Sequence, residues 1–338
     1  MRINLSKAHL FNSEIIHKIK TAQDAVIVEK PQIGVTGKRN ELVFFIKPEL
    51  LIVEEDIKIQ NSLKLIEEKF RTFEVDVEGA VIVPGHVLEQ QEIMNRHYGF
   101  INQLSRKASG LIDPATRQEI FKILDQDDQG THLILGGHQF LESFDTDVNT
   151  LSKIWFAQEA KKLRSGFYFI EDSFQEEPII LVNGFHPSQL QHFTNKEHRI
   201  LLMLLHTDTD WEAMKFDLVG DTFPERAKFG SIRGALYANP EHFGQHSVGI
   251  NTNGVHLSAG PFEAAFEVVN FFGPILDLDP SKTPPLALKK AMASGISEER
   301  ALSLLENPKL NQSDLFTETE SLDTPDAVEL IRKNLAEN

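Results

Sequence analysis

The chain has 338 residues, of which 41% are hydrophobic and 25% charged, as expected for a globular protein of one large or two modest domains. Its net charge of −16 argues against binding to a nucleic-acid backbone or an anionic membrane. The absence of cysteine excludes disulfides and cysteine-ligated zinc. The longest aliphatic run, Ile200 to Leu205, is too short to span a bilayer, and no secretory signal follows Met1, so we expect a cytoplasmic protein.

The first third of the chain alternates strand and helix patterns. We interpret residues 1–40 as an extension packed on the main domain. The run Glu41 to Lys47 is apolar at most positions and predicts a central strand that ends at Lys47-Pro48. Three elements are predicted after it: a helix over 57–73, a strand over 73–83 and a helix over 86–104 that carries His97 and Tyr98. This order is half of a ferredoxin-like βαββαβ plan.

The middle of the chain, residues 106–198, predicts a separate inserted subdomain. Its elements are helices over 114–124 and 151–163, a hairpin of strands near 166–172 and 177–184, and a short helix from Pro187. His132 and His138 lie near two aspartates, but their spacing is not diagnostic of a metal site.

The second half of the main domain follows, with a strand at 199–207, a loop region over 222–233, a strand near 247–252 and a helix from Pro261 to Phe272. Residues 273–338 read as a linker and a tail. We expect two helical pieces within 286–306, a flexible segment over 307–325 and a last helix over 327–335.

The run from Met214 to Phe272 carries the most chemistry. It contains Gly220-Asp-Thr-Phe-Pro224, Gly230-Ser-Ile-Arg-Gly234, Asn253-Gly-Val-His-Leu-Ser258 and a helix that carries Glu263 and Glu267. His256 lies just ahead of this helix, whose first N–H groups favour a phosphoryl group. Glu267 is placed to reach back and fix the imidazole tautomer. Taken alone, a histidine before a helix is more often a hydrogen-bonded surface residue.

In their order and spacing these segments resemble nucleoside diphosphate kinases. Phe44-Phe-Ile-Lys-Pro-Glu49 and His97-Tyr98 are similar to two further segments of that family. The resemblance covers 41–105 and 199–272, which would form the catalytic domain. It implies an α+β protein with a ferredoxin-like βαββαβ antiparallel sheet core, a large inserted subdomain and terminal extensions.

The resemblance also implies a ping-pong phosphotransferase that moves the γ-phosphate of a nucleoside triphosphate to a nucleoside diphosphate through a phosphohistidine. His256 would be the nucleophile and Glu267 would orient it; Ser258 would bridge the two, and Tyr98 would lie near the phosphates. The implied nucleotide contacts are Lys47, Thr222, Arg233 and Asn253. Mg²⁺ would arrive with the nucleotide, without a metal site of the protein's own, and a homodimer is expected.

Several positions depart from the family pattern. Phe216 stands where the family has a phosphate-binding arginine, and Lys215 beside it is a candidate substitute, although lysine cannot copy a bidentate guanidinium. Leu257 replaces a glycine, and Ala259-Gly260 replaces Asp-Ser. Two alternatives therefore stay open: a phosphotransferase with a specialised nucleotide-like acceptor, and a non-catalytic nucleotide-binding module.

Overall fold

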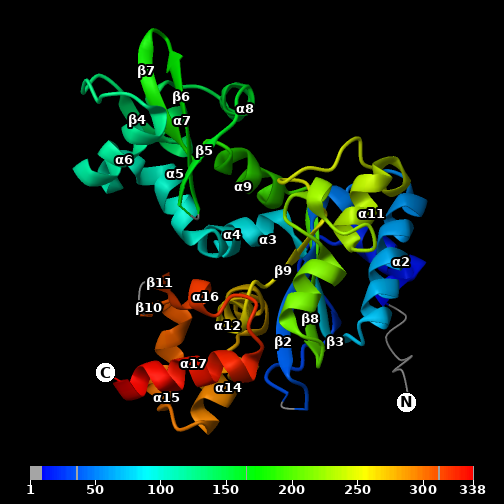
Figure 1. Ribbon diagram of the computed structural model, residues 1–338. Helices are drawn as coiled ribbons and strands as arrows, with labels where there is room; N and C mark the ends of the chain where they lie inside the picture. Colours follow the sequence, from blue (N-terminus) through cyan, green and yellow to red (C-terminus); the bar gives the residue numbers. More distant parts are fainter. Residues whose placement is uncertain (1–9, 36, 165, 311–312, 338) are drawn as a thin grey trace. The chain divides into compact units, whose positions relative to one another are not determined.

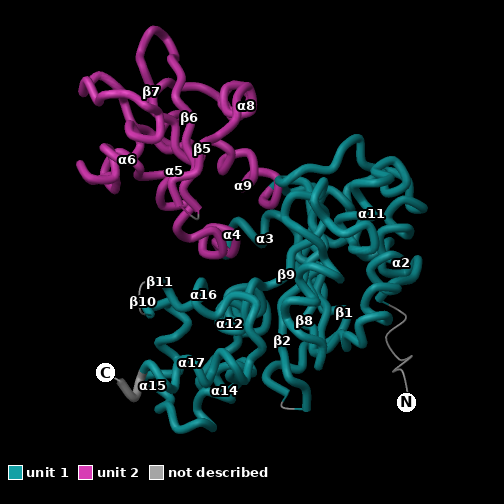
Figure 2. Tube along the Cα trace, in the orientation of Figure 1, with its two compact units in different colours: residues 1–91, 195–338 teal, residues 92–194 magenta. Residues whose placement is uncertain are grey.

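The computed structural model describes residues 10–35, 37–164, 166–310 and 313–337 (Figure 1). The chain divides into two compact units, coloured separately in Figure 2. Unit 1 comprises Met1–Gln91 and Asn195–Asn338, and unit 2 comprises Glu92–Thr194. Residues 92–105, which the sequence analysis grouped with the catalytic domain, therefore belong to unit 2. What was expected of residues 1–9 lies outside the described residues.

Unit 1 is built on a five-stranded sheet. Its strands are β1 (Val26–Glu29), β2 (Asn40–Ile46), β3 (Asp76–Pro84), β8 (Arg199–Thr207) and β9 (Val255–Leu257). They lie in the order β1-β3-β8-β2-β9, and all neighbours are antiparallel. Strands β2, β3, β8 and β9 with their intervening helices confirm the predicted α+β class and the ferredoxin-like core, to which β1 adds an edge strand. Unit 2 interrupts the chain between β3 and β8.

Helices cover both faces of this sheet, so every residue of β2 is buried. Successive side chains of a strand point to opposite faces. Phe44 on one face packs in the core that also holds Ile59 and Leu63 of α2 (Asp56–Thr72). Phe45 on the other face lies 5.3 Å, between ring centroids, from Phe271, in the turn that continues α12 (Pro261–Glu267). The predicted strand over 41–47 and helix over 57–73 are thus confirmed. The remaining helices before the tail are α1 (Ser13–Thr21), α3 (Gly85–Gln90), α10 (Trp211–Ala213), α11 (Ile232–Ala238) and α13 (Gly273–Leu276).

The C-terminal part of unit 1 adds a small helical layer. Its elements are α14 (Leu286–Ala293), α15 (Glu298–Ser303), β10 (Lys309–Leu310), β11 (Ser313–Asp314), α16 (Leu315–Glu318) and α17 (Thr324–Glu337). The segment 307–325 was expected to lack regular structure, but its described residues include β10, β11 and α16. Leu315 and Thr319 are fully buried, and the side chains of Asn307 and Asp314 accept backbone N–H bonds at the start of α16.

Unit 2 is a four-stranded sheet flanked by helices. The strands are β4 (Leu133–Gly136), β5 (Lys161–Arg164), β6 (Phe167–Phe174) and β7 (Glu177–Val182), in the order β4-β7-β6-β5, with only β4 and β7 parallel among the described pairs. The helices are α4 (Ile93–His97), α5 (Gly99–Leu111), α6 (Pro114–Leu124), α7 (Gly137–Ser143), α8 (Val148–Phe156) and α9 (His186–Thr194). The predicted hairpin is the antiparallel pair β6 and β7, whose alternating side chains serve two separate cores.

Three predicted elements are wrong. The single helix over 86–104 is broken into α3, α4 and α5, and Glu92 takes a left-handed backbone at the break, with φ of 50°. The helix over 151–163 ends at Phe156, and Lys161–Arg164 pairs with β6 as a strand. No strand forms over 247–252. Strand β9 begins only after Gly254, whose φ of 82° makes the turn that brings Val255 beside β2.

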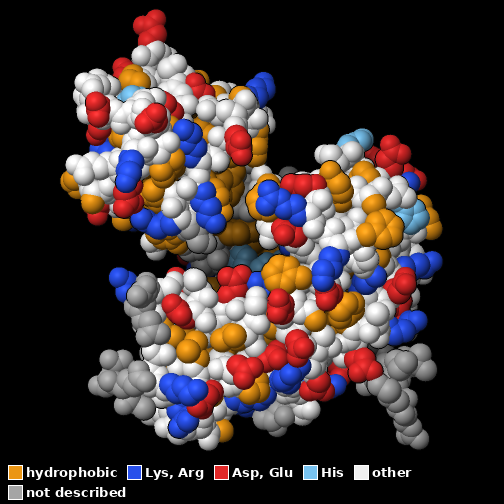
Figure 3. Space-filling view, in the orientation of Figure 1, with side chains coloured by type: hydrophobic (Ala, Val, Ile, Leu, Met, Phe, Trp, Pro, Cys, Tyr) orange, Lys and Arg blue, Asp and Glu red, His pale blue; other side chains and the backbone are white. Residues whose placement is uncertain are grey.

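The surface shows no broad area of one charge on the face drawn in Figure 3, where acidic and basic side chains are interspersed. Such a face lacks the single-sign field that attracts a polyanion. Across the described part of the chain, no helix combines the length and the apolar character needed to cross a membrane.

Candidate active site

His256 lies on strand β9, ahead of helix α12 as the sequence suggested, although the strand itself was expected over 247–252. It pairs with Phe45 of β2, and the two rings stack with centroids 4.5 Å apart and planes 15° from parallel. Directly opposed side chains of antiparallel strands share one face, which explains the stacking. Its neighbours Val255 and Leu257 point to the other face, into the core. The imidazole is therefore fixed by the strand pairing and stays 19% exposed.

A buried carboxylate holds the imidazole of His256. Glu267 Oε1 lies 2.7 Å from His256 Nε2, and Glu267 Oε2 accepts a 2.5 Å hydrogen bond from the Ser258 hydroxyl. That hydroxyl oxygen in turn accepts the backbone N–H of Val43 at 2.9 Å. Because a carboxylate oxygen accepts, the imidazole proton belongs on Nε2 and the lone pair on Nδ1. The structure thus brings together His256, Ser258 and Glu267, as the sequence analysis expected.

Lys47 follows the last residue of β2 and is 7% exposed. Its Nζ donates a 2.7 Å hydrogen bond to Asn253 Oδ1, and Asn253 Nδ2 donates to the carbonyl of Thr222 at 3.2 Å. Burial lowers the pKa of Lys47 to about 8; the Glu49 carboxylate opposes this shift and the Arg233 guanidinium adds to it. Burial thus destabilises the charged form of Lys47, and an anionic ligand would stabilise it.

Arg233, in the first turn of α11, joins the loop before it to strand β9. Its Nη1 donates to the carbonyl of Gly220 at 3.0 Å and its Nη2 to the carbonyl of Val255 at 2.9 Å, while its buried Nε–H has no partner among the described residues. Burial lowers the pKa of Arg233 to about 10, against the charges of Asp221 and Glu49. The guanidinium therefore links two backbone segments by hydrogen bonds and is also a desolvated positive charge.

Glu49 is a residue of this site to which the sequence analysis gave no role. It is 5% exposed, and its Oε1 accepts the N–H of Gly254 at 2.9 Å. The carbonyl of Gly254 accepts the N–H of Lys47 at 2.9 Å. A Cβ at position 254 would lie 2.5 Å from a methyl carbon of Leu236, so this turn requires glycine. The sequence feature that could have indicated a role for Glu49 is its position directly after Lys47-Pro48.

Glu263 is a second acidic residue that the sequence analysis did not single out for the site. Burial raises its pKa to about 8, the neighbouring charges of Glu267 and Glu320 add to this, and a backbone hydrogen bond at Ala259 and the Lys215 ammonium oppose it. Two carboxyl groups on successive turns of α12 are thus distinct: Glu267 is bonded to two donors, and Glu263 favours its neutral form near pH 7.

The other predicted site residues lie as follows. Thr222 is exposed, in the loop that Asn253 contacts through its backbone. Lys215 donates to Glu320 Oε1 at 2.6 Å and to the Ser321 hydroxyl at 2.9 Å, so its ammonium already has anionic and polar partners. Phe216 is 40% exposed. Tyr98 belongs to unit 2, where its ring contacts those of His186 and Phe193. The expected roles of these residues remain predictions.

The fold and the site define an α+β protein with a ferredoxin-like core and a carboxylate-oriented histidine on an edge strand. No family model matches the chain, and no curated protein matches it. Among solved structures, an NDP kinase from Pyrobaculum aerophilum is similar, with 17% sequence identity over 69% of this chain and 95% of that chain and a TM-score of 0.32. A likeness this distant carries no information about the chemistry of the site.

Proposed function

We propose that this protein is a nucleoside diphosphate kinase-like phosphotransferase that works through a phosphohistidine on His256. The observation that carries the proposal is the 2.7 Å contact between His256 Nε2 and the buried Glu267 carboxylate. An imidazole whose Nε2–H is held by a carboxylate presents a nucleophilic Nδ1 near neutral pH. The buried Lys47 and the partly buried Arg233, two cations that desolvation disfavours, support an anionic substrate.

The reaction is an in-line exchange at phosphorus in two halves. His256 Nδ1 attacks the γ-phosphorus, an N–P bond forms, and the bond to the β-phosphate oxygen breaks, so that the nucleoside diphosphate leaves with the electron pair. An acceptor diphosphate oxygen then attacks the phosphohistidine, and the N–P bond breaks. Glu267 stabilises the positive charge that develops on the imidazole during the first half. Lys47 and Arg233 would stabilise charge on the phosphoryl oxygens.

Mg²⁺ would accompany the nucleotide. The cationic side chains of Lys47 and Arg233 cannot ligate a metal, and Glu49, the carboxylate beside them, accepts the N–H of Gly254. This donor set fits a cation that keeps most of its water and binds through substrate phosphates. The ion would supply further neutralisation of phosphate charge.

One observation favours a second candidate, a nucleotide-binding module without transfer activity. Both Nη groups of Arg233 donate to backbone carbonyls, and the family arginine is replaced by Phe216. A phosphate would then have fewer guanidinium donors than in the resembling family. This candidate predicts nucleotide binding with no phosphoenzyme.

The deciding experiment is incubation with γ-labelled ATP and Mg²⁺, mapping of acid-labile, base-stable phosphate, and a chase with nucleoside diphosphates. We expect label on His256 that moves to the diphosphates. His256→Ala should carry no label, whereas His246→Ala, a change at an exposed histidine, should label normally. Bound nucleotide without any label would favour the non-catalytic module, and label that stays on His256 would point to a specialised acceptor.

A further inference from the structure

The turn Ser258–Gly260 joins β9 to α12 and carries the hydroxyl that binds Glu267. Two groups hold the backbone of this turn from outside. The indole Nε1–H of Trp211 donates to the carbonyl of Ser258 at 3.0 Å, and the N–H of Ser321 donates to the carbonyl of Ala259 at 2.9 Å. The turn that directs Glu267 is therefore fixed by two segments that the proposed chemistry does not include.

The C-terminal segment Thr319–Thr324 lies so close to this turn that only glycine fits at position 260. A Cβ built on Gly260 would lie 2.6 Å from the carbonyl oxygen of Thr319 and 3.1 Å from Cα of Glu320. Both are backbone atoms and cannot swing away. The replacement of Asp-Ser by Ala259-Gly260, noted in the sequence as a departure, therefore matches the presence of this segment.

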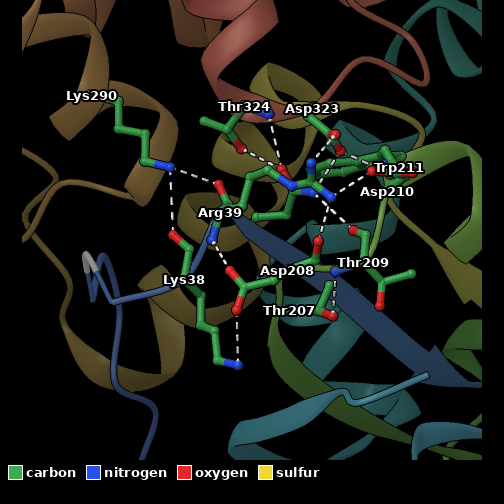
Figure 4. A network of polar contacts seen from close by, with 11 residues as sticks. Lys38, Arg39, Thr207, Asp208, Thr209, Asp210, Trp211, Lys290, Asp323 and Thr324 are labelled. Atoms are coloured by element: carbon green, nitrogen blue, oxygen red, sulfur yellow. Dashed lines mark hydrogen bonds and ion pairs between the residues drawn. The ribbon is translucent and has the colours of Figure 1, made fainter. Parts of the chain in front are cut away.

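The same segment is anchored to the sheet and to Trp211, as Figure 4 shows. Asp323 Oδ1 accepts the backbone N–H of Trp211 at 2.8 Å and the side-chain amide of Asn40 at 2.7 Å, while its Oδ2 lies 3.1 Å from Arg39 Nη1. The N–H and hydroxyl of Thr324 both donate to Asn40 Oδ1, at 2.9 and 3.0 Å. Asn40 is the fully buried first residue of β2, the strand that pairs with β9.

We propose that segment Thr319–Thr324 is a positioning element of the active centre. Through Trp211 and the turn Ser258–Gly260, it sets the direction in which Ser258 and Glu267 hold His256. This inference rests on the proposed role of His256 as the nucleophile. Asp323 and Trp211 are then positioning residues that never touch the substrate.

The physical reason is that a short hydrogen bond depends steeply on its angle and length. Glu267 receives one donor from the Ser258 side chain, so a displaced Ser258 backbone rotates the carboxylate and loosens its hold on Nε2–H. The segment removes that freedom directly at the carbonyl of Ala259 and beside the Cα of Gly260. Trp211, whose backbone N–H is held by Asp323, removes it at the carbonyl of Ser258. A catalytic side chain needs such support from its surroundings to keep a productive geometry.

The test compares Trp211→Phe, which removes the indole donor and keeps an aromatic ring, with Trp155→Phe. The chain contains two tryptophans, Trp155 and Trp211; both are buried, and Trp155 lies in unit 2. The first readout is the tautomer of His256, from nitrogen shifts of ¹⁵N-histidine-labelled full-length protein assigned with His256→Gln. The second is the single-turnover rate of labelling by ATP, with the nucleotide affinity measured separately.

We expect Trp211→Phe to populate a mixture of His256 tautomers and to slow labelling about tenfold, with unchanged nucleotide affinity. Gly260→Ala, which displaces the segment from the turn, should also give mixed tautomers and slow labelling. This variant replaces Trp211→Phe in the test if Trp211→Phe does not fold. Asp326→Asn, an exposed aspartate in α17, and Trp155→Phe should match the wild type.

A single, unchanged Nε2–H tautomer in folded Trp211→Phe or Gly260→Ala would overturn the positioning role, even if the variant were less stable. The tautomer readout does not depend on transfer activity. A wild-type protein that never labels would defeat the proposed function, while the tautomer comparison would still decide whether the segment positions His256.

Discussion

The Nζ of Lys47 and the amide oxygen of Asn253 lie 2.7 Å apart at the end of the central strand β2, where Lys47 is 7% exposed. Burial holds the pKa of Lys47 at about 8, so the ammonium loses its charge as the pH rises through that value. Affinity for a nucleotide should therefore fall between pH 7 and pH 9.5.

Titration with a fluorescent ATP analogue at each pH checks this expectation. Lys47→Arg should keep its affinity over the same range, because arginine stays charged. Lys64→Arg, a change on the exposed face of α2, should behave as the wild type. A wild-type affinity that does not change with pH would mean that the charge of Lys47 does not contribute to binding.

Glu267→Gln should slow phosphoenzyme formation. The amide would keep one acceptor oxygen but would turn a donor toward either His256 or Ser258, and a charge-assisted hydrogen bond would be lost. Such a bond contributes about 1.5–3 kcal/mol, which is a factor of about 10 to 100 in rate. Rapid-quench labelling with γ-labelled ATP measures this effect, with Glu225→Gln at an exposed position as the control. Equal labelling rates in both variants would argue that Glu267 has no part in activating His256.

Phe216→Arg should raise turnover with common nucleoside diphosphates. The ring of Phe216 is 40% exposed and Lys215 Nζ lies 5.4 Å from its centroid, so a guanidinium has room to reach solvent there. An added guanidinium offers bidentate contacts to phosphate that lysine cannot supply. Steady-state kinetics should show a higher kcat/KM, and Phe223→Arg, at a phenylalanine of 38% exposure, should not. No gain in a well-folded Phe216→Arg protein would mean that the pocket has been rebuilt around the loss.

Glu263→Gln should change how stability depends on pH. The pKa of Glu263 is raised to about 8 in the folded state, by burial and by the facing Glu267 and Glu320, against about 4.3 unfolded. The folded state then binds more protons, so this contribution to stability is complete below pH 4.3 and is lost as the pH rises toward and through 8.

Thermal unfolding between pH 5 and pH 8.5 should show Tm falling more steeply in the wild type than in Glu263→Gln. Glu298→Gln, at an exposed position in α15, serves as the control and should retain the wild-type slope. Parallel slopes in wild type and Glu263→Gln would show that Glu263 is ionised in the folded protein.

Glu41→Gln should destabilise unit 1. The buried carboxylate of Glu41 accepts the backbone N–H groups of Gly34 and Leu286, at 2.6 and 2.7 Å, and contacts His206 Nε2 at 2.9 Å. An amide nitrogen in place of one oxygen leaves a buried N–H without an acceptor, which costs about 1–3 kcal/mol.

Urea unfolding followed by Trp211 fluorescence in a Trp155→Phe background isolates the stability of unit 1. Glu55→Gln, at an exposed position, provides the baseline. If Glu41→Gln unfolds at the same urea concentration as Glu55→Gln, the three contacts of Glu41 are not stabilising.

The sequence predicted the elements whose pattern is long and regular. The apolar run ending at Lys47 and the helical stripe of residues 57–73 each fix one element and one buried face, so β2 and α2 follow from local rules. The ferredoxin-like plan with an antiparallel sheet followed from the succession of elements and from the resemblance, and the antiparallel pairing of β2 with both β8 and β9 agrees with it. Among the site residues, His256, Ser258 and Glu267 were expected to meet, and they do.

The misses have a common cause in contacts between segments far apart in the chain. Strand β9 is three residues long, and it exists because β2 offers an edge there. The polar stretch after Asn307 reads as flexible, yet its side chains bind Asn40 and Lys215, which no local pattern reveals. Glu49 carries no periodic signal either, since its role depends on the turn at Gly254.

The contact between Asn40 and Thr324 spans 284 residues of the chain, and it sets an order of events during synthesis. All strands of the main sheet precede the tail in the chain, so they emerge from the ribosome first, and the sheet can pair and His256 can meet Phe45 before the tail has emerged. Some sixty further residues must then be synthesised before Ser321 can bind the carbonyl of Ala259 and Asp323 can bind the N–H of Trp211. A nascent chain that stalls within this interval would have the sheet and His256, but it would lack segment Thr319–Thr324, which orients the imidazole.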